Sequence, residues 1–132
     1  MIENKLKKDY IDSVIREPYQ VLEFMREAEK VRSDICPSIG KEIGQFLYFM
    51  AIFSKSRRIL EVGTSIGYST SWLAMAAREN GGLVDTVEVA ERLIREAESN
   101  FKELKLDPFI RCHQGYGEEI LPGLKPGYDL IF

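Results

Sequence analysis

An acidic residue, two glycines and several hydroxyl residues lie close together in residues 59–74, whose sequence is ILEVGTSIGYSTSWLA. Glu61 follows an apolar run, Gly63 and Gly67 come next, and Ser69 opens a predicted helix. Glycine lets the backbone turn tightly and approach a ligand, and the first turn of a helix offers free N–H groups and a positive dipole end. The pattern therefore predicts a ligand site where a strand passes into a helix. On the glycines alone, a turn without a ligand explains the pattern equally well.

A second carboxylate favours a nucleotide-like ligand. Glu88 ends another apolar run, VDTVE, roughly 20 residues after Gly67, and nucleotide-binding α/β folds hold an acid for the ribose hydroxyls at this spacing. Because the carboxyl ends of neighbouring parallel strands face one cleft, Glu61 and Glu88 are expected at the same edge of a sheet. The alternative is that Glu88 is a solvated cap of the helix that begins near Glu91.

The residues of the glycine loop indicate which nucleotide fits. A dinucleotide fingerprint needs a glycine two positions after the first one, and this chain has Ser65 there. The carboxylate of Glu61 would repel a pyrophosphate and attract an ammonium or sulfonium group. A ligand with a cationic end, a small carboxylate and a ribose suits all of these groups, and S-adenosylmethionine has them. A nicotinamide-binding module is a weaker alternative.

Strands and helices are predicted to alternate through most of the chain, which is typical of a parallel sheet joined by right-handed crossovers. Apolar residues at helical spacing precede this part, with Pro18 as an interruption and a further apolar stripe on Ile43, Phe46, Leu47 and Met50. The predicted strands cover residues 59–62, 83–87, 109–113 and 128–132, and the predicted helices cover residues 69–78, 91–104 and 118–124. The last strand would leave an apolar edge, so either the chain is a piece of a longer protein or another chain covers that edge.

The composition indicates one globular domain and argues against several classes of protein. The 132 residues are 45% hydrophobic and carry a net charge of −3, which gives no electrostatic basis for binding nucleic acid. No apolar stretch is long enough to span a bilayer and the charged N-terminus lacks the apolar core of a signal peptide, so the predicted location is cytoplasmic. Cys36 and Cys112 lack a CxxC spacing, so both are predicted to be free, buried thiols and no zinc site is expected.

Three segments carry a resemblance to a known family, namely ILEVGTSIGYSTSWLA, the upstream PSIGKEIGQFL and the downstream HQGYGEEILPGL. Together they resemble class I S-adenosylmethionine-dependent O-methyltransferases of the caffeoyl-CoA and catechol type, over about residues 34–132. The resemblance implies an α/β, Rossmann-like methyltransferase fold with a parallel sheet in the order 3-2-1-4 for the part present. Residues 1–36 would form an N-terminal helical segment and residues 37–132 the cofactor-binding domain, with the C-terminal part of the family fold absent.

The resemblance also implies which residues bind S-adenosylmethionine. Glu61 and Gly63 would line its methionine end, Ser69 would bind its carboxylate and Glu88 its ribose hydroxyls. The other implied contacts are Ile39 from the upstream segment, Thr64, Ser65, Gly67 and Tyr68 from the glycine loop, and Gly115 from the third-strand loop. Four further residues would surround the adenine, namely Val89, Tyr116, Gly117 and Glu118. For Tyr68, packing beneath the loop is an equally good interpretation.

Some residues near these motifs are given other roles. Many relatives carry an acid followed by a small residue in the third-strand loop, where this chain has Tyr116 and Gly117, so recognition of the adenine amino group would fall to Glu118. His113 is interpreted as structural. Trp72 and the aromatic cluster of residues 46–53 are interpreted as core.

The activity that the resemblance implies is transfer of a methyl group from S-adenosylmethionine to an oxygen of a small molecule, a displacement that depends on alignment of the acceptor. In the family, magnesium or a similar ion is held by carboxylates just after the fourth strand, and the sequence stops before them at Phe132; Asp129 is not assigned this role. Catalytic residues are therefore unknown, no metal ligand is predicted, and a divalent metal is expected in a full-length form only. The alternative is a non-catalytic module that binds S-adenosylmethionine or S-adenosylhomocysteine.

The expected partners follow from these interpretations. A small-molecule methyl acceptor is predicted, whereas nucleic acid and membranes are not. A homodimer through the open edge of the last strand is the remaining partner prediction, because an exposed apolar strand edge favours pairing.

Overall fold

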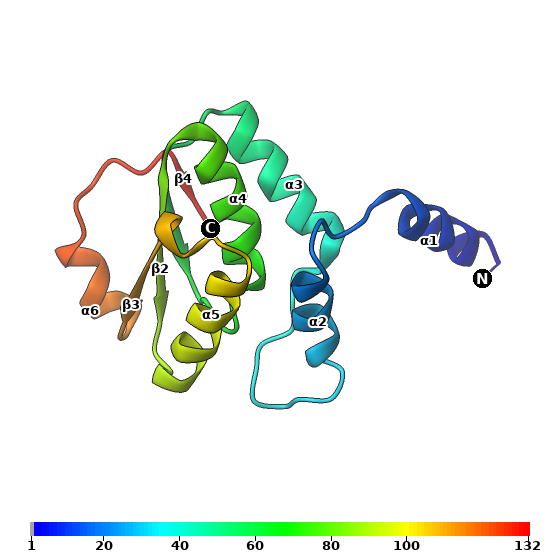
Figure 1. The fold of residues 1–132 in the computed structure, drawn as a ribbon, viewed down its shortest axis with the longest axis horizontal. Coiled ribbons are helices and arrows are strands. Elements are labelled where there is room, and N and C mark those ends of the chain that lie inside the picture. Colours follow the sequence, from blue (N-terminus) through cyan, green and yellow to red (C-terminus); the bar gives the residue numbers. More distant parts are fainter. Residues whose placement is uncertain (1) are drawn as a thin grey trace.

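A four-stranded parallel sheet forms the centre of the molecule, and the computed structural model describes residues 2–132 (Figure 1). The strands lie in the order β3-β2-β1-β4, and every neighbouring pair is parallel. Their bounds are Arg58–Val62 for β1, Leu83–Glu88 for β2, Ile110–Gln114 for β3 and Leu130–Ile131 for β4. The predicted strand order is confirmed. The parallel pairing brings the carboxyl ends of the strands to one edge of the sheet.

Six helices surround or extend from this sheet among the described residues. Their bounds are Ile2–Val14 for α1, Gln20–Ala28 for α2, Gly40–Phe53 for α3, Tyr68–Asn80 for α4, Glu91–Glu103 for α5 and Gly117–Ile120 for α6, with short 3-10 helices at Asp107–Phe109 and Leu121–Gly123. In Figure 1, α3 runs alongside α4, while α1 extends away from the rest of the chain. The predicted break at Pro18 lies between α1 and α2.

The helix α4 is the centre of the hydrophobic core. Every residue from Thr70 to Ala77 is buried, and Trp72 is only 3% exposed. Leu22 and Met25 of α2 belong to the same core cluster, so α2 is packed with the sheet domain. The interpretation of Trp72 as a core residue is confirmed. Gly81 ends α4 in a left-handed conformation with φ of 66°, which a glycine adopts without steric cost.

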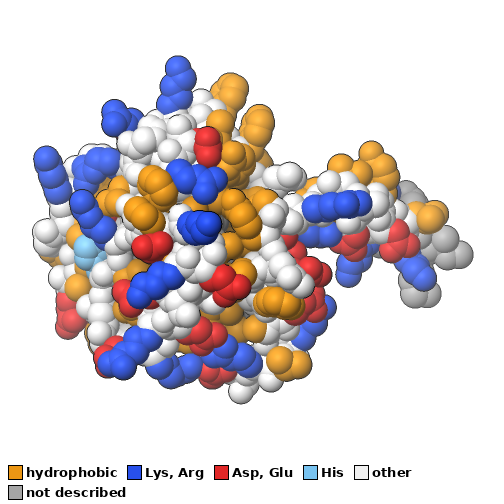
Figure 2. All heavy atoms as spheres, in the orientation of Figure 1, with side chains coloured by type: hydrophobic (Ala, Val, Ile, Leu, Met, Phe, Trp, Pro, Cys, Tyr) orange, Lys and Arg blue, Asp and Glu red, His pale blue; other side chains and the backbone are white. Residues whose placement is uncertain are grey.

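The outer face of α3 differs from the sequence interpretation. The helix contacts α4 through a narrow strip that contains Gly44, Leu47 and Ala51, all buried. The prediction of core residues over 46–53 is confirmed for Leu47 and Ala51. It is wrong for the three phenylalanines, which are largely exposed, at 59% for Phe46, 61% for Phe49 and 76% for Phe53. Hydrophobic side chains gather accordingly on the α3 side of the surface in Figure 2.

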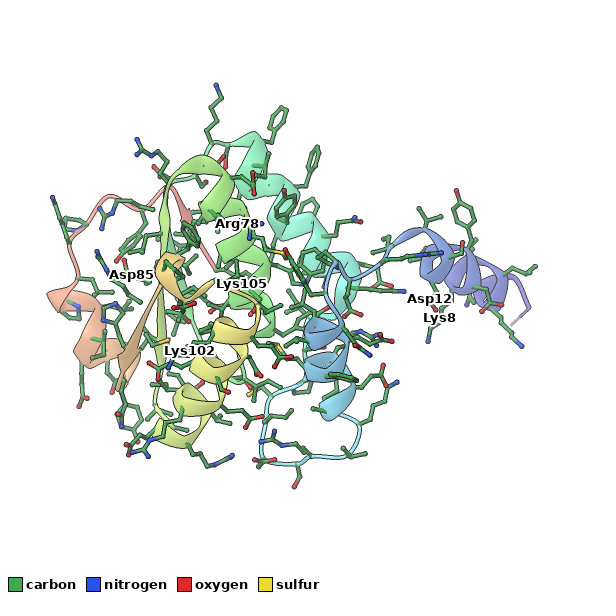
Figure 3. All side chains as sticks on the ribbon, viewed as in Figure 1. Lys8, Asp12, Arg78, Asp85, Lys102 and Lys105 are labelled. Atoms are coloured by element: carbon green, nitrogen blue, oxygen red, sulfur yellow. The ribbon has the colours of Figure 1, made fainter. Side chains whose placement is uncertain are left out.

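Polar residues on the sheet have structural partners. His113 Nε2 lies 2.8 Å from Asp85 Oδ1, and Tyr128 donates a hydrogen bond of 3.0 Å to the other oxygen of Asp85, which is labelled in Figure 3. His113 is therefore part of a hydrogen-bonded group on the sheet. Both cysteines are free, but the prediction that both are buried is wrong, because Cys36 lies exposed in a loop and Cys112 is only half-buried.

The last strand lies at the edge of the sheet, where Ile131 is 68% exposed. Backbone hydrogen bonds continue the pairing past β4, because Phe132 donates to Leu60 and accepts from Val62. Within the described residues, no helix is long and apolar enough to cross a membrane.

Candidate functional site

A cavity lies at the carboxyl end of β1, between the glycine loop and the segment that precedes α3. Its volume is about 110 Å³, and it is enclosed by Met25, residues 35–39, Gly63, Thr64, Ser65, Ile66, Tyr68, Ser69 and Phe132. Six of the residues predicted to bind a cofactor line it, namely Ile39, Gly63, Thr64, Ser65, Tyr68 and Ser69. The fold therefore brings the upstream segment and the glycine loop together, although more than twenty residues separate them in the sequence.

The two glycines of the loop have different roles. Gly63 has φ of 105°, and a Cβ added there would meet no atom within 4 Å, so the space above it is open to a ligand. Gly67 has φ of 93°, and an added Cβ would lie 2.4 Å from Phe101 Cε1. Gly67 is thus required for packing against α5, and it does not line the cavity.

Ser65 is a residue of the loop whose side-chain hydroxyl lacks a hydrogen-bond partner among the described residues. Its φ of 48° is left-handed, a conformation that costs a non-glycine residue energy and is common at functional sites. Its Oγ is buried and forms no hydrogen bond to any described residue. Since buried hydroxyl groups are normally hydrogen-bonded, this oxygen is a group that a bound molecule can satisfy.

Glu61 lies beneath the cavity and not in its wall. Its side chain is fully buried, and its carboxylate accepts hydrogen bonds from Ser69 Oγ at 2.6 Å, Thr70 Oγ1 at 2.5 Å and Thr86 Oγ1 at 2.6 Å. Burial raises the pKa of Glu61, and the three hydroxyl donors oppose that shift by stabilising the charged form. The sequence predicted that Glu61 contacts the ligand directly, but its side chain has no surface open to the cavity. Ser69 lies between Glu61 and the cavity.

Glu88 connects the ends of two strands. Its Oε2 accepts a hydrogen bond of 2.9 Å from the backbone N–H of Ser65, and its Oε1 accepts one of 3.0 Å from the N–H of Ala90. The carboxylate is half-buried and lies outside the enclosed cavity, next to the glycine loop. Both oxygens already have one partner, and each keeps a lone pair for another donor.

The third-strand loop forms the adjoining rim of the sheet. Gly115 donates a backbone hydrogen bond of 3.0 Å to Glu88, and a Cβ on Gly117 would lie 3.6 Å from Val62. Val89 and Tyr116 are exposed there, as is Glu118. The predicted site residues thus divide into an enclosed group around the glycine loop and an open group along the ends of β2 and β3.

The sequence did not indicate several residues that hold the site. Thr70 and Thr86 bind the carboxylate of Glu61, and Thr64 Oγ1 lies 2.7 Å from Thr86 Oγ1. Glu17, from the connection between α1 and α2, accepts a hydrogen bond of 2.7 Å from Tyr68 OH. The two threonines could have been identified from their positions near Glu61 on neighbouring elements. Nothing in the sequence indicates the role of Glu17, because it is distant from Tyr68 in the chain.

Comparison with known proteins agrees with this geometry. A family model described as a methyltransferase domain matches residues 60–132, more than half of the chain. The chain belongs to this methyltransferase family. It is 34% identical over 100 residues to a catechol O-methyltransferase of Niastella koreensis, across 72% of this chain and 44% of that protein. It is 32% identical over 96 residues to a catechol O-methyltransferase of Mycobacterium tuberculosis, across 72% of this chain and 43% of that protein.

Solved methyltransferase structures have the same fold. The O-methyltransferase TomG from Streptomyces achromogenes, in complex with SAM, superposes with a TM-score of 0.80 at 30% identity, over 92% of this chain and 56% of that one. An O-methyltransferase from Bacillus cereus, in complex with SAH, gives a TM-score of 0.81 at 27% identity, over 99% and 61% of the two chains. The predicted Rossmann-like methyltransferase fold is confirmed, and the chain spans less than half the length of the curated relatives named above.

Proposed function

We propose that this chain is the S-adenosylmethionine-binding part of an O-methyltransferase that acts on a small molecule. The observation that carries the proposal is the cavity at the end of β1, where an open space over Gly63 adjoins the unsatisfied hydroxyl of Ser65. Solved relatives at 30% and 27% identity hold SAM or SAH. When bound, the cofactor would supply an activated methyl group.

The dimensions of the cavity support a two-part binding mode. Complete sites for small molecules measure roughly 300 Å³ or more, so a cavity of about 110 Å³ encloses one end of the cofactor only. We place the methionine end there, beside Ile39 and the first turn of α4, whose backbone N–H groups suit its carboxylate. The ribose then lies at Glu88, and the adenine lies along the open rim formed by Val89, Tyr116, Gly117 and Glu118.

Within this proposal, Glu61 acts through Ser69. The negative charge beneath the cavity favours the ammonium and sulfonium groups of the cofactor, while the hydroxyl groups of Ser69, Thr70 and Thr86 hold the carboxylate in place. Tyr68 supports the loop from the side through its bond to Glu17. These residues bind and orient the cofactor, and alignment accounts for a large part of the rate of a displacement reaction.

The remaining assignments are also proposals. Residues 37–132 are the cofactor-binding domain, following the helical segment of residues 1–36, and the methyl acceptor is a small molecule such as a catechol, as the names of the relatives suggest.

Among residues 4–132, no three His, Cys, Asp or Glu side chains form a group that could hold a metal, so a divalent ion stays a prediction for a longer form. A cytoplasmic location is supported by the two free cysteines. The exposed edge at Ile131 supports a homodimer.

Calorimetric titration of S-adenosylhomocysteine into this chain tests the proposal. We expect saturable binding that Glu88→Ala weakens at least tenfold, because the proposed hydrogen bonds from the two ribose hydroxyls to this carboxylate are lost. Glu98→Ala is the matched control, since Glu98 is an exposed acid on α5, and it should bind like the unaltered chain. A folded chain that binds no S-adenosylhomocysteine, or equal affinity in both variants, would contradict the proposed site.

A further inference from the structure

A second, larger cavity lies on the other side of α4, where α3 and the connection between α1 and α2 meet it. Its volume is about 300 Å³, at the lower end of the range for small-molecule sites. On α4 it is bounded by Trp72, Met75 and Arg78, which lie farther along the helix than the cofactor loop. None of its lining residues lines the first cavity. It is therefore a separate place on the molecule.

The lining of this second cavity is cationic. Arg16 and Arg78 contribute two guanidinium groups, and no lining residue carries a carboxylate. Within residues 4–132 the Arg16 guanidinium forms no hydrogen bond or ion pair. Arg78, labelled in Figure 3, has Glu79 as an exposed neighbour at 3.3 Å, and Tyr19 and Glu79 raise its pKa. The cavity thus keeps an excess of positive charge in a chain whose net charge is negative.

Aromatic and thioether side chains form much of the remaining wall, together with Pro18 and Gln45. Tyr19, Tyr48 and Trp72 supply three aromatic rings, and Met75 adds a thioether, which makes favourable contacts with aromatic groups. Trp72 is held in place by Gly44, where an added Cβ would lie 2.3 Å from its Nε1. Trp72 is therefore packed closely against α3.

The segment that carries Arg16 and Tyr19 is also held in position. Glu17 lies between them, and its nearly buried carboxylate accepts hydrogen bonds of 2.8 Å and 3.1 Å from Arg26 and one of 2.7 Å from Tyr68. Such a bidentate pair with arginine is rigid and specific. A preorganised segment loses less conformational freedom when a ligand binds.

We propose that this cavity binds a small aromatic molecule that carries a carboxylate, at a site separate from that of the cofactor. The planar guanidinium of Arg16 or Arg78 matches a carboxylate in two parallel hydrogen bonds. The ring of the ligand packs among Tyr19, Tyr48 and Trp72. A single ring with one acidic group suits a cavity of this volume.

Fluorescence provides a direct readout, because Trp72 is the only tryptophan of the chain and it lines the cavity. We would titrate benzoate while recording the tryptophan emission, with benzyl alcohol as a ring without charge and sulfate as a charge without a ring. Benzoate should give a saturable change at concentrations where the other two give none. An equal response to sulfate would overturn the aromatic part of the proposal, and an equal response to benzyl alcohol would overturn the ionic part.

Variants connect the signal to the cavity. Arg16→Gln leaves an exposed position without its charge and should weaken benzoate binding about tenfold, and Arg16→Gln with Arg78→Gln should abolish it. Arg95→Gln is the matched control, since Arg95 is 75% exposed on α5 and pairs with Glu91. Unchanged binding in the double variant, with thermal unfolding showing that it is folded, would overturn the proposal.

The relation to the cofactor site is tested in the same assay. Benzoate should bind with saturating S-adenosylhomocysteine present, because the two cavities share no residue. Competition between the two would show that benzoate occupies the cofactor site and would overturn the separate cavity. If S-adenosylhomocysteine itself does not bind, the benzoate titration still stands, so the two proposals fail independently.

Discussion

The two sides of α4 differ in how their charged groups are placed. At the start of the helix, which faces the sheet, an acid is fully enclosed and three hydroxyl groups satisfy it. On the side that faces α3, two guanidinium groups line a cavity, and the aromatic side chains on the outer faces of α3 are exposed to solvent. The first arrangement fixes a loop, whereas the second leaves charge and apolar surface free for contacts. Substitutions on the sheet side should therefore affect folding and cofactor binding, and substitutions at the exposed positions of α3 should affect folding little.

The largest effect is expected from Gly67→Ala. The substitution places a Cβ 2.4 Å from Phe101 Cε1 and a non-glycine residue at φ of 93°. Overpacking and left-handed strain together should lower the free energy of unfolding by about 3 kcal/mol. Urea denaturation measures the change. A loss below about 1 kcal/mol would show that α5 moves aside easily and that the sheet side is less rigid than the structure indicates.

Gly63→Ala separates binding from folding on the same side of the helix. Its φ of 105° is strained for alanine, but the added methyl group meets no atom within 4 Å. We expect about 1–2 kcal/mol less stability and a loss of S-adenosylhomocysteine affinity of at least tenfold, because the methyl group enters the ligand space. Calorimetry and urea denaturation of the same sample distinguish the two effects. Unchanged affinity would place the ligand elsewhere.

Glu61→Gln tests the enclosed acid through pH. Burial raises the pKa of Glu61 in the folded state above its ordinary value of 4.5, so at a pH between these two pKa values the folded state retains a proton that the unfolded state has lost. Stability from this group is therefore complete below pH 4.5 and falls as the pH rises through the folded-state pKa. Glutamine has no such penalty, so the variant should gain stability relative to the unaltered chain as the pH rises.

Urea denaturation of both proteins between about pH 4 and pH 8 measures this difference. Subtracting the stability of the unaltered chain from that of the variant at each pH cancels the contributions of other groups. One such group is Asp34, whose pKa is lowered by Arg32 and Arg92, so that its contribution to stability is lost as the pH falls. A difference that does not vary with pH would show that Glu61 is not enclosed as the structure has it.

The smallest effect is expected on the outer side, from Phe49→Ser. Phe49 is largely exposed and stacks on Phe53 with ring centroids 6.1 Å apart, so its loss should change the free energy of unfolding by no more than about 0.5 kcal/mol. Leu73→Ala, at a fully buried position of α4, should cost about 2–5 kcal/mol in the same measurement. A Phe49→Ser loss near that of Leu73→Ala would mean that another surface covers the outer side of α3 in solution.

Much of the fold could be predicted because its signals are local. The alternation of apolar patterns indicated the strands and helices, and the strand order that the family resemblance implied is confirmed. The prediction was wrong for the aromatic residues of α3 because a helical stripe of apolar residues does not reveal how much of it a neighbour covers. It was wrong for Cys36 for a similar reason, since a cysteine in a loop is exposed unless another element packs over it.

The site was predictable in its residues and less so in their arrangement. Ser65 and Gly63 were identified from the glycine loop, and the structure places both at the cavity. Nothing in the sequence shows that Glu61 is sealed beneath Ser69, because its partners Thr70 and Thr86 belong to different elements. The assignment of each residue to a part of the cofactor stays a prediction.

The sequence by itself determined the elements, their order and the loop at the end of β1, because apolar periodicity and the backbone freedom of glycine act over a few residues. Only the tertiary structure decided which groups meet across long separations. It joined Glu17 to Tyr68, brought Thr86 to the carboxylate of Glu61 and placed Arg16 and Arg78 around one cavity. Such contacts depend on how whole helices pack, and packing is decided by the shape of both partners and not by either segment alone.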